Sequence, residues 1–188
     1  MPFELDALRR ELAVKAKCGI DFLLAASVVW ATIAGVWAQP GSATRHSFIT
    51  FFVGGLLLPL AWVFSKVLRT TWALPHNPLH PLGLWLNLAQ IFYLPFLFFI
   101  YSHQPAYFPM TYGIITGAHF FPYAWYYAAR PYAIMAGVLP VGCWLLGLRT
   151  AASAPYWVPV FVVGMLLLLA AWLYGSYSQH RAAYQPAA

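Results

Sequence analysis

Long apolar stretches alternate with short polar connections along the whole chain. A membrane-spanning helix needs about 20 mostly apolar residues, and proline, glycine, serine and charged residues fill the gaps between stretches of about that length. The pattern therefore predicts an all-α bundle that crosses a membrane about six times. The predicted spans are residues 19–38, 47–66, 82–102, 107–128, 131–148 and 156–176, the fifth being the shortest.

The two ends of the chain differ from this apolar core. Leu5, Leu8 and Leu12 recur at helical spacing, and acidic residues precede basic ones by four positions in the same segment. This pattern is typical of an amphipathic helix at a membrane surface. We expect three parts: a cytoplasmic amphipathic helix at 1–18, a transmembrane bundle at 19–176 and a short cytoplasmic tail at 177–188.

Composition supports a membrane protein. Hydrophobic residues make up 62% of the chain and charged residues only 7%, whereas a soluble domain carries about 25% charged residues. The net charge is +6, but the basic residues cluster near predicted helix ends, which favours a role in topology over nucleic-acid binding. Membrane lipids are the expected surroundings.

The basic residues also predict orientation. Arg45 and Arg149 fall on one side of the membrane, and by the positive-inside rule the other side, with both termini, is cytoplasmic. Although Val36–Ala38 resembles a signal-peptidase site, the acidic leader before it favours retention of the first span. The basic residues of the cytoplasmic side are Arg9, Arg10, Lys15, Lys17, Lys66, Arg69, Arg130 and Arg181.

Polar residues inside the spans carry the candidate chemistry, because hydrocarbon offers them no water. Asn87 and Gln90 are three apart and share one face of the third span. Thr116, His119 and Tyr123 share one face of the fourth. Estimated depth places all five in the inner half or near the centre of the membrane. They predict one cavity with His119 at its centre and the other four as substrate-binding residues.

Asp21 and Arg130 both lie at the inner boundary, and we expect them to pair as a gate at the mouth of this cavity. Each polar group also has a structural alternative. Asp21 can sit among lipid head groups, the two amides can join helices, and His119 can bond a neighbouring tyrosine.

Other chemistries lack support in the sequence. His76 and His80 have a metal-ligand spacing, but three prolines between 75 and 81 disfavour a helix there and no third ligand is evident. Cys18 and Cys143 fall at opposite predicted depths, so we expect neither a disulfide nor a metal site. No phosphate-binding loop or nucleophile motif is present. We therefore predict no cofactor and no metal.

Three stretches together resemble a family of small bacterial multi-spanning membrane proteins with no assigned function. They are Glu4–Ala26, Asn87–Phe96 (NLAQIFYLPF) and Ile115–Tyr127 (ITGAHFFPYAWYY). The resemblance implies six spans in a bacterial cytoplasmic membrane. It carries no substrate, cofactor or catalytic residue.

Three functional hypotheses follow. The leading one is binding or transport of a small molecule, ion or lipid through the inner-half cavity, with a protonatable His119. The second is a structural or accessory subunit, for which the Gly113–Gly117 pair offers a contact surface within the bundle, in a homo-oligomer or with a partner. The third, a membrane enzyme, is weakest, because no nucleophile or metal set accompanies His119.

Overall fold

The computed structural model describes residues 2–184, and all its regular elements in that range are helical. Three short 3-10 segments join or interrupt the α-helices: η1 (Lys17–Gly19), η2 (Ala89–Tyr93) and η3 (Pro105–Tyr107). The α-helices are α1 (Pro2–Lys15), α2 (Ile20–Trp37), α3 (Ala43–Gly55), α4 (Leu57–Leu68), α5 (His80–Leu88), α6 (Leu94–His103), α7 (Phe108–Ala118), α8 (Phe121–Tyr126), α9 (Arg130–Thr150) and α10 (Trp157–Ala182).

Five helical stretches are long and apolar enough to cross a membrane. They match five of the six predicted spans: Lys17–Trp37, Ala43–Leu68, His80–His103, Arg130–Thr150 and Trp157–Ala182. The remaining predicted span, 107–128, is present as α7 and α8, with a turn at His119 and Phe120 between them. The predicted tail at 177–188 begins as a continuation of α10 to Ala182, and its last four residues lie outside the described part of the chain.

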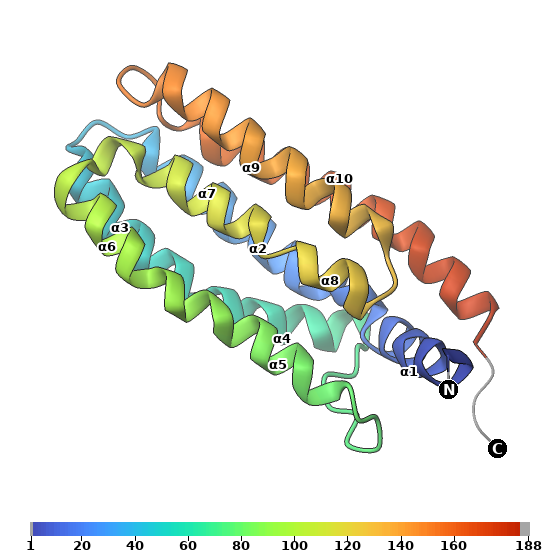
Figure 1. Cartoon of the computed structure of the whole chain (residues 1–188). Coiled ribbons are helices and arrows are strands. Elements are labelled where there is room, and N and C mark those ends of the chain that lie inside the picture. The colour runs from blue at the N-terminus through green and yellow to red at the C-terminus, as the bar shows by residue number, and fades with distance from the viewer. Residues whose placement is uncertain (1, 185–188) are drawn as a thin grey trace.

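The spans form three layers (Figure 1). In the middle layer, α2 and the α7–α8 pair lie side by side, and α9 with α10 covers one side. On the other side, α3–α4 and α5–α6 form the third layer. Within this third layer α4 packs extensively on α2. The α5 helix is held less closely, by the adjacent η2 and by Tyr126 of α8, whose hydroxyl lies against Gly83.

Three spans are interrupted shortly before a proline. Proline lacks the N–H that would bond to the carbonyl four residues earlier. Leu56 interrupts the second span before Pro59, η2 precedes Pro95, and the turn at 119–120 precedes Pro122. Pro140, by contrast, lies inside an uninterrupted α9.

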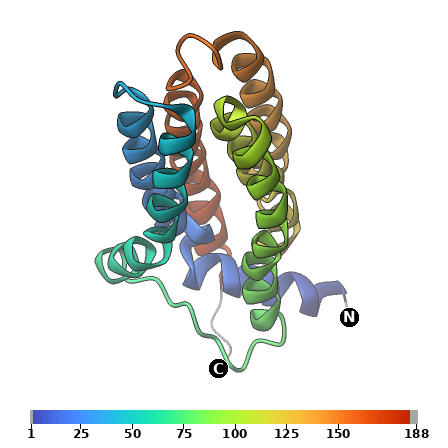
Figure 2. The ribbon, with the colours of Figure 1, turned by 90° about the vertical axis from the view of Figure 1, so that its left-hand side faces the viewer.

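One end of the bundle holds α1, which lies crosswise to the spans (Figure 2). We call it the α1 end; the basic residues predict that it faces the cytoplasm. A tight turn joins α1 to α2, in which Lys17, Cys18 and Gly19 all have left-handed φ angles of 47°, 53° and 74°. Leu12 and Ala13 of α1 are buried against the bundle.

Residues 69–79, between α4 and α5, pack on this end of the bundle, and we call them the strap. The Thr71 amide donates to the Lys15 carbonyl (2.9 Å). The Asn77 side chain, buried at 1% exposure, donates to the Leu8 carbonyl (3.0 Å) and to Glu11 (2.8 Å). His76 also contacts Glu11, at 2.8 Å. The strap is thus fixed to α1 by side chains, although the sequence predicted only a connection.

The outer surface of the bundle is strongly apolar. Many large hydrophobic side chains are more than half exposed, among them Phe52, Trp62, Trp85 and Phe92, the last at 82%. In water such a surface would drive aggregation, whereas in lipid it is the expected outside of a bundle. Together with the long apolar helices, this surface identifies an integral membrane protein.

The glycine pair on α7 packs inside the molecule. A Cβ atom on Gly113 would lie 2.6 Å from Cys143 Sγ, and one on Gly117 would lie 2.5 Å from Pro140 Cδ. Both neighbours belong to α9, so the pair allows the close approach of α7 to α9. The sequence left open whether this pair makes contact within the bundle, in a homo-oligomer or with a partner. The structure shows contact within the bundle.

Candidate functional site: an intramembrane cavity

A cavity of about 110 Å³ lies between the middle layer and the third layer. It runs from the α1 end along the half of α2 between Gly19 and Trp30. Its walls come from α2, α4, α5, η2, α7, α8 and the start of α9. The lining residues are Gly19, Phe22, Leu23, Ala26, Val29, Trp30, Leu57, Gly83, Asn87, Gln90, Tyr112, Thr116, His119, Phe120, Tyr123, Tyr127 and Tyr132.

All five residues predicted to bind substrate line this one cavity: Asn87, Gln90, Thr116, His119 and Tyr123. Three of the lining residues stand at the helix breaks, namely Leu57, Gln90 and His119. The three interrupted spans therefore all border this one cavity at the points where their helices are broken. The geometry brings the predicted residues together, and their role in binding a ligand stays a prediction.

The polar side chains of the cavity differ in how they are bonded. Asn87 donates to the Gly83 carbonyl (2.9 Å) and Thr116 to the Tyr112 carbonyl (2.9 Å), each within its own helical segment. Within residues 2–184, the side chains of Gln90 and His119 form no hydrogen bond, and no fully enclosed side-chain polar atom lacks a partner. The polar atoms of Gln90 and His119 therefore reach open space and are free to bond a ligand.

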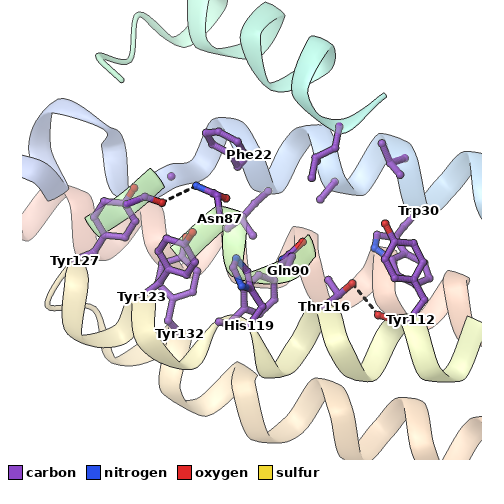
Figure 3. Close-up of a pocket in the computed structure, with 17 residues that line it drawn as sticks. Phe22, Trp30, Asn87, Gln90, Tyr112, Thr116, His119, Tyr123, Tyr127 and Tyr132 are labelled. Atoms are coloured by element: carbon purple, nitrogen blue, oxygen red, sulfur yellow. Dashed lines mark hydrogen bonds between the residues drawn. The ribbon is translucent and has the colours of Figure 1, made fainter. Parts of the chain in front are cut away.

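Aromatic rings close the two ends of the cavity (Figure 3). At one end lie Tyr123, Tyr127 and Tyr132, with ring centroids of Tyr123 and Tyr132 5.7 Å apart. At the other end, Trp30 packs on Tyr112 at 5.0 Å. Asn87, Gln90 and His119 occupy the space between. The cavity thus has a polar middle between two aromatic ends.

The predicted gate pair does not form. Asp21 is buried at 1% exposure, and its carboxylate accepts hydrogen bonds from Thr70 Oγ1 (2.6 Å) and Trp72 Nε1 (2.7 Å) of the strap. Arg130 is exposed and makes no ion pair within the described residues. Depth alone suggested the pair, but the two residues face different sides of the bundle.

Asp21 instead fixes the strap beside the cavity. Trp72, which donates to Asp21, also stacks on Phe22 with ring centroids 4.9 Å apart. Phe22 is a wall of the cavity. The strap therefore contacts the cavity wall from behind, through the Trp72 ring on Phe22, and the buried carboxylate holds that ring in place.

Several lining residues had no sequence signal as site residues. Phe22 and Trp30 sit in an apolar run and look like ordinary span residues. Tyr132 lies near the start of α9, and its hydroxyl donates to the Cys18 carbonyl (2.8 Å) in the left-handed turn after α1. Only the packing of α9 against this turn brings Tyr132 to the cavity.

The loop histidines have local partners. His76 contacts Glu11, and His80 Nε2 lies 2.8 Å from the Trp72 carbonyl. No group of three His, Cys, Asp or Glu residues able to hold a metal ion occurs between residues 2 and 184. Cys18 and Cys143 are both free and buried.

Fold and site together define an integral membrane protein with a partly open cavity between its spans. The chain belongs to the family of unknown function DUF7010, whose model matches residues 5–176 and so includes every span. No curated protein and no solved structure matches the chain.

Proposed function

We propose that this protein binds a small molecule in the cavity between α2, η2 and α7–α8, and moves it to or from the predicted cytoplasmic side. The observation that carries the proposal is the arrangement of Gln90 and His119. Both have unbonded polar groups that line the same partly open cavity within an apolar bundle. Polar groups inside a membrane span are costly and are usually kept for a function.

The lining suggests the chemistry of the ligand. It contains no Asp, Glu, Lys or Arg side chain, so a fixed charge would not recognise the ligand. A volume of 110 Å³ approaches that of an engineered cavity of roughly 150 Å³ that binds benzene. A neutral molecule about one ring in size would pack between the aromatic ends and bond to Gln90 and His119.

The strap offers a route of access. Because Trp72 stacks on the wall residue Phe22, release of the strap would free Phe22 to move and widen the α1 end of the cavity. The positive-inside rule predicts that this end faces the cytoplasm, and the family resemblance implies that the membrane is a bacterial inner membrane. The loosely packed α5–η2 segment provides a second moving part.

Native mass spectrometry of the protein in mild detergent tests the proposal. We expect a small bound molecule on the wild type that is lost in His119→Ala. His103→Ala is the matched control, because His103 is an exposed histidine at the end of α6, remote from the cavity lining. Retention of the same molecule by His119→Ala, or its loss from the control, would contradict the proposal.

Transport is tested separately, by loading proteoliposomes with the molecule so identified. We expect wild-type protein to release it faster than His119→Ala does. Equal rates would limit the function to binding.

A further inference from the structure

A second cavity of about 430 Å³ lies at the α1 end, on the side of the bundle formed by α9 and α10. It does not share a single lining residue with the first cavity. We call it the α9–α10 groove. Its lining residues are Ala128, Arg130, Pro131, Ile134, Trp172, Gly175, Ser176, Gln179 and His180.

The groove combines two kinds of surface. Arg130, Ser176, Gln179 and His180 provide hydrogen-bond donors. The other wall is apolar and faces outward, since Ile134 is 49% exposed and Trp172 is 45% exposed. Because α10 continues past this point to Ala182, the polar residues lie nearer the end of the bundle than the apolar ones. This order matches that of a phospholipid, whose polar headgroup lies outside its acyl chains.

The groove carries the positive charge of Arg130, and no described acidic side chain neutralises it. The described acidic residues are Glu4, Asp6, Glu11 and Asp21, and none of them lines the groove or pairs with Arg130. Asp6 pairs with Arg9, and Asp21 is occupied by the strap. Arg130 is also the first residue of α9, where the helix dipole favours an anion.

We propose that the α9–α10 groove binds the headgroup of an anionic phospholipid from the same leaflet. The Arg130 guanidinium would bind the phosphate, Gln179 and Ser176 would donate further hydrogen bonds, and Trp172 and Ile134 would contact the acyl chains. No carboxylate lies in the groove to receive the ammonium group of a zwitterionic lipid. This inference does not depend on the proposed ligand of the first cavity.

Native mass spectrometry with added lipid tests the groove. Wild type, Arg130→Gln and Arg149→Gln are each incubated with phosphatidylglycerol or with phosphatidylcholine of the same chain length. Arg149 is the matched control, because it is an exposed arginine at the opposite end of the same helix. We expect the wild type and Arg149→Gln to retain phosphatidylglycerol, and Arg130→Gln to retain about fivefold less.

Three outcomes would overturn the proposal. The first is equal retention of phosphatidylglycerol by wild type and Arg130→Gln. The second is equal retention of the two lipids by wild type, which would remove the requirement for an anionic headgroup. The third is displacement of the lipid by millimolar inorganic phosphate alone, which would point to a site for free anion. Because Arg130 is exposed and makes no ion pair within residues 2–184, we expect its substitution to leave folding intact.

Discussion

Asp21 is the clearest case of one buried side chain that holds a larger piece of the structure. Its carboxylate receives two hydrogen bonds from the strap. A hydrogen bond to a charged group contributes about 1.5–3 kcal/mol, and in Asp21→Ala both are lost. We expect the melting temperature to fall by roughly 5 °C or more in this variant.

Asp6→Ala is the matched control for this measurement. Asp6 is an acidic residue at the same end, but its side chain is 63% exposed and pairs with Arg9 at the surface. Such exposed pairs contribute little, so thermal unfolding of this variant should resemble that of the wild type. Equal destabilisation by the two substitutions would show that the Asp21 hydrogen bonds do not hold the strap.

Glu11 makes docking of the strap dependent on pH. Partial burial raises the pKa of Glu11, but hydrogen bonds from His76 and Asn77 outweigh it, and the net pKa is below the ordinary value of 4.5. A lowered pKa in the folded protein stabilises it above the unfolded value, and this stabilisation is lost as the pH falls through the folded pKa. The strap should therefore loosen below about pH 4.5.

Hydrogen–deuterium exchange of residues 74–78, corrected for intrinsic rates, measures this effect. At neutral pH we expect slower exchange in the wild type than in Glu11→Gln, and the difference should vanish in acid. A difference of constant size down to pH 3 would mean that the Glu11 charge does not hold the strap.

Helical periodicity within single spans was enough to find five polar residues of the first cavity, but not its aromatic walls. Asn87 with Gln90, and Thr116 with His119, share faces because of helical periodicity, and both faces turned toward one space. The pair of Asp21 and Arg130 was predicted from depth alone, and that prediction was wrong. Equal depth does not fix the side of the bundle on which a residue lies, and that depends on how all the helices pack.

At the scale of elements, α7 and α9 depend on small residues for their close packing. A Cβ atom on Gly117 would lie 2.5 Å from Pro140 Cδ, so Gly117→Ala forces the helices apart. Overpacking of this kind costs about 1–3 kcal/mol. We expect a lower melting temperature in Gly117→Ala.

Gly164→Ala in α10 is the control for this substitution, because a Cβ atom there would meet nothing within 4 Å. The alanine should be neutral or slightly stabilising, since glycine in a helix interior costs about 0.5–1 kcal/mol. A melting temperature for Gly117→Ala equal to that of Gly164→Ala would contradict the packing described here.

The helix breaks were only partly predictable. Pro95 and Pro122 stand after interruptions, as the missing N–H suggests, but Pro140 does not interrupt α9. The second span breaks at Leu56, before Pro59. Whether a proline interrupts a helix depends on its neighbours, and Pro140 lies in the closely packed α7–α9 contact.

The docking of the strap on α1 also depends on tertiary packing, and the sequence did not predict it. Its contacts with α1 join residues about 65 positions apart.

At the scale of the whole molecule, the number of crossings decides where the two ends lie. Five helices are long and apolar enough to span, and we expect the interrupted α7–α8 pair to make the sixth crossing. An even number places α1 and the end of α10 on the same side, as Figure 1 shows. With α1 on the predicted cytoplasmic side, six crossings place Ala152, in the α9–α10 connection, outside and Ala183 inside, whereas five crossings would reverse the two.

Single-cysteine labelling in intact cells tests this topology. A membrane-impermeant maleimide should label Ala152→Cys from outside and Ala183→Cys only after permeabilisation. Both positions are exposed, and the natural cysteines, Cys18 and Cys143, are fully buried, so background labelling should be low. Labelling of Ala183→Cys from outside, with Ala152→Cys labelled only after permeabilisation, would contradict six crossings from a cytoplasmic α1.

The central claim is that Gln90 and His119 face a space that holds a ligand. An experimental structure of the protein, purified in nanodiscs from its native membrane, tests that claim most directly. We predict density that does not belong to the protein, in contact with both side chains and between the aromatic ends of the cavity. A structure in which α5 and η2 close onto α7–α8, with Gln90 and His119 bonded to protein groups and no space between them, would contradict it.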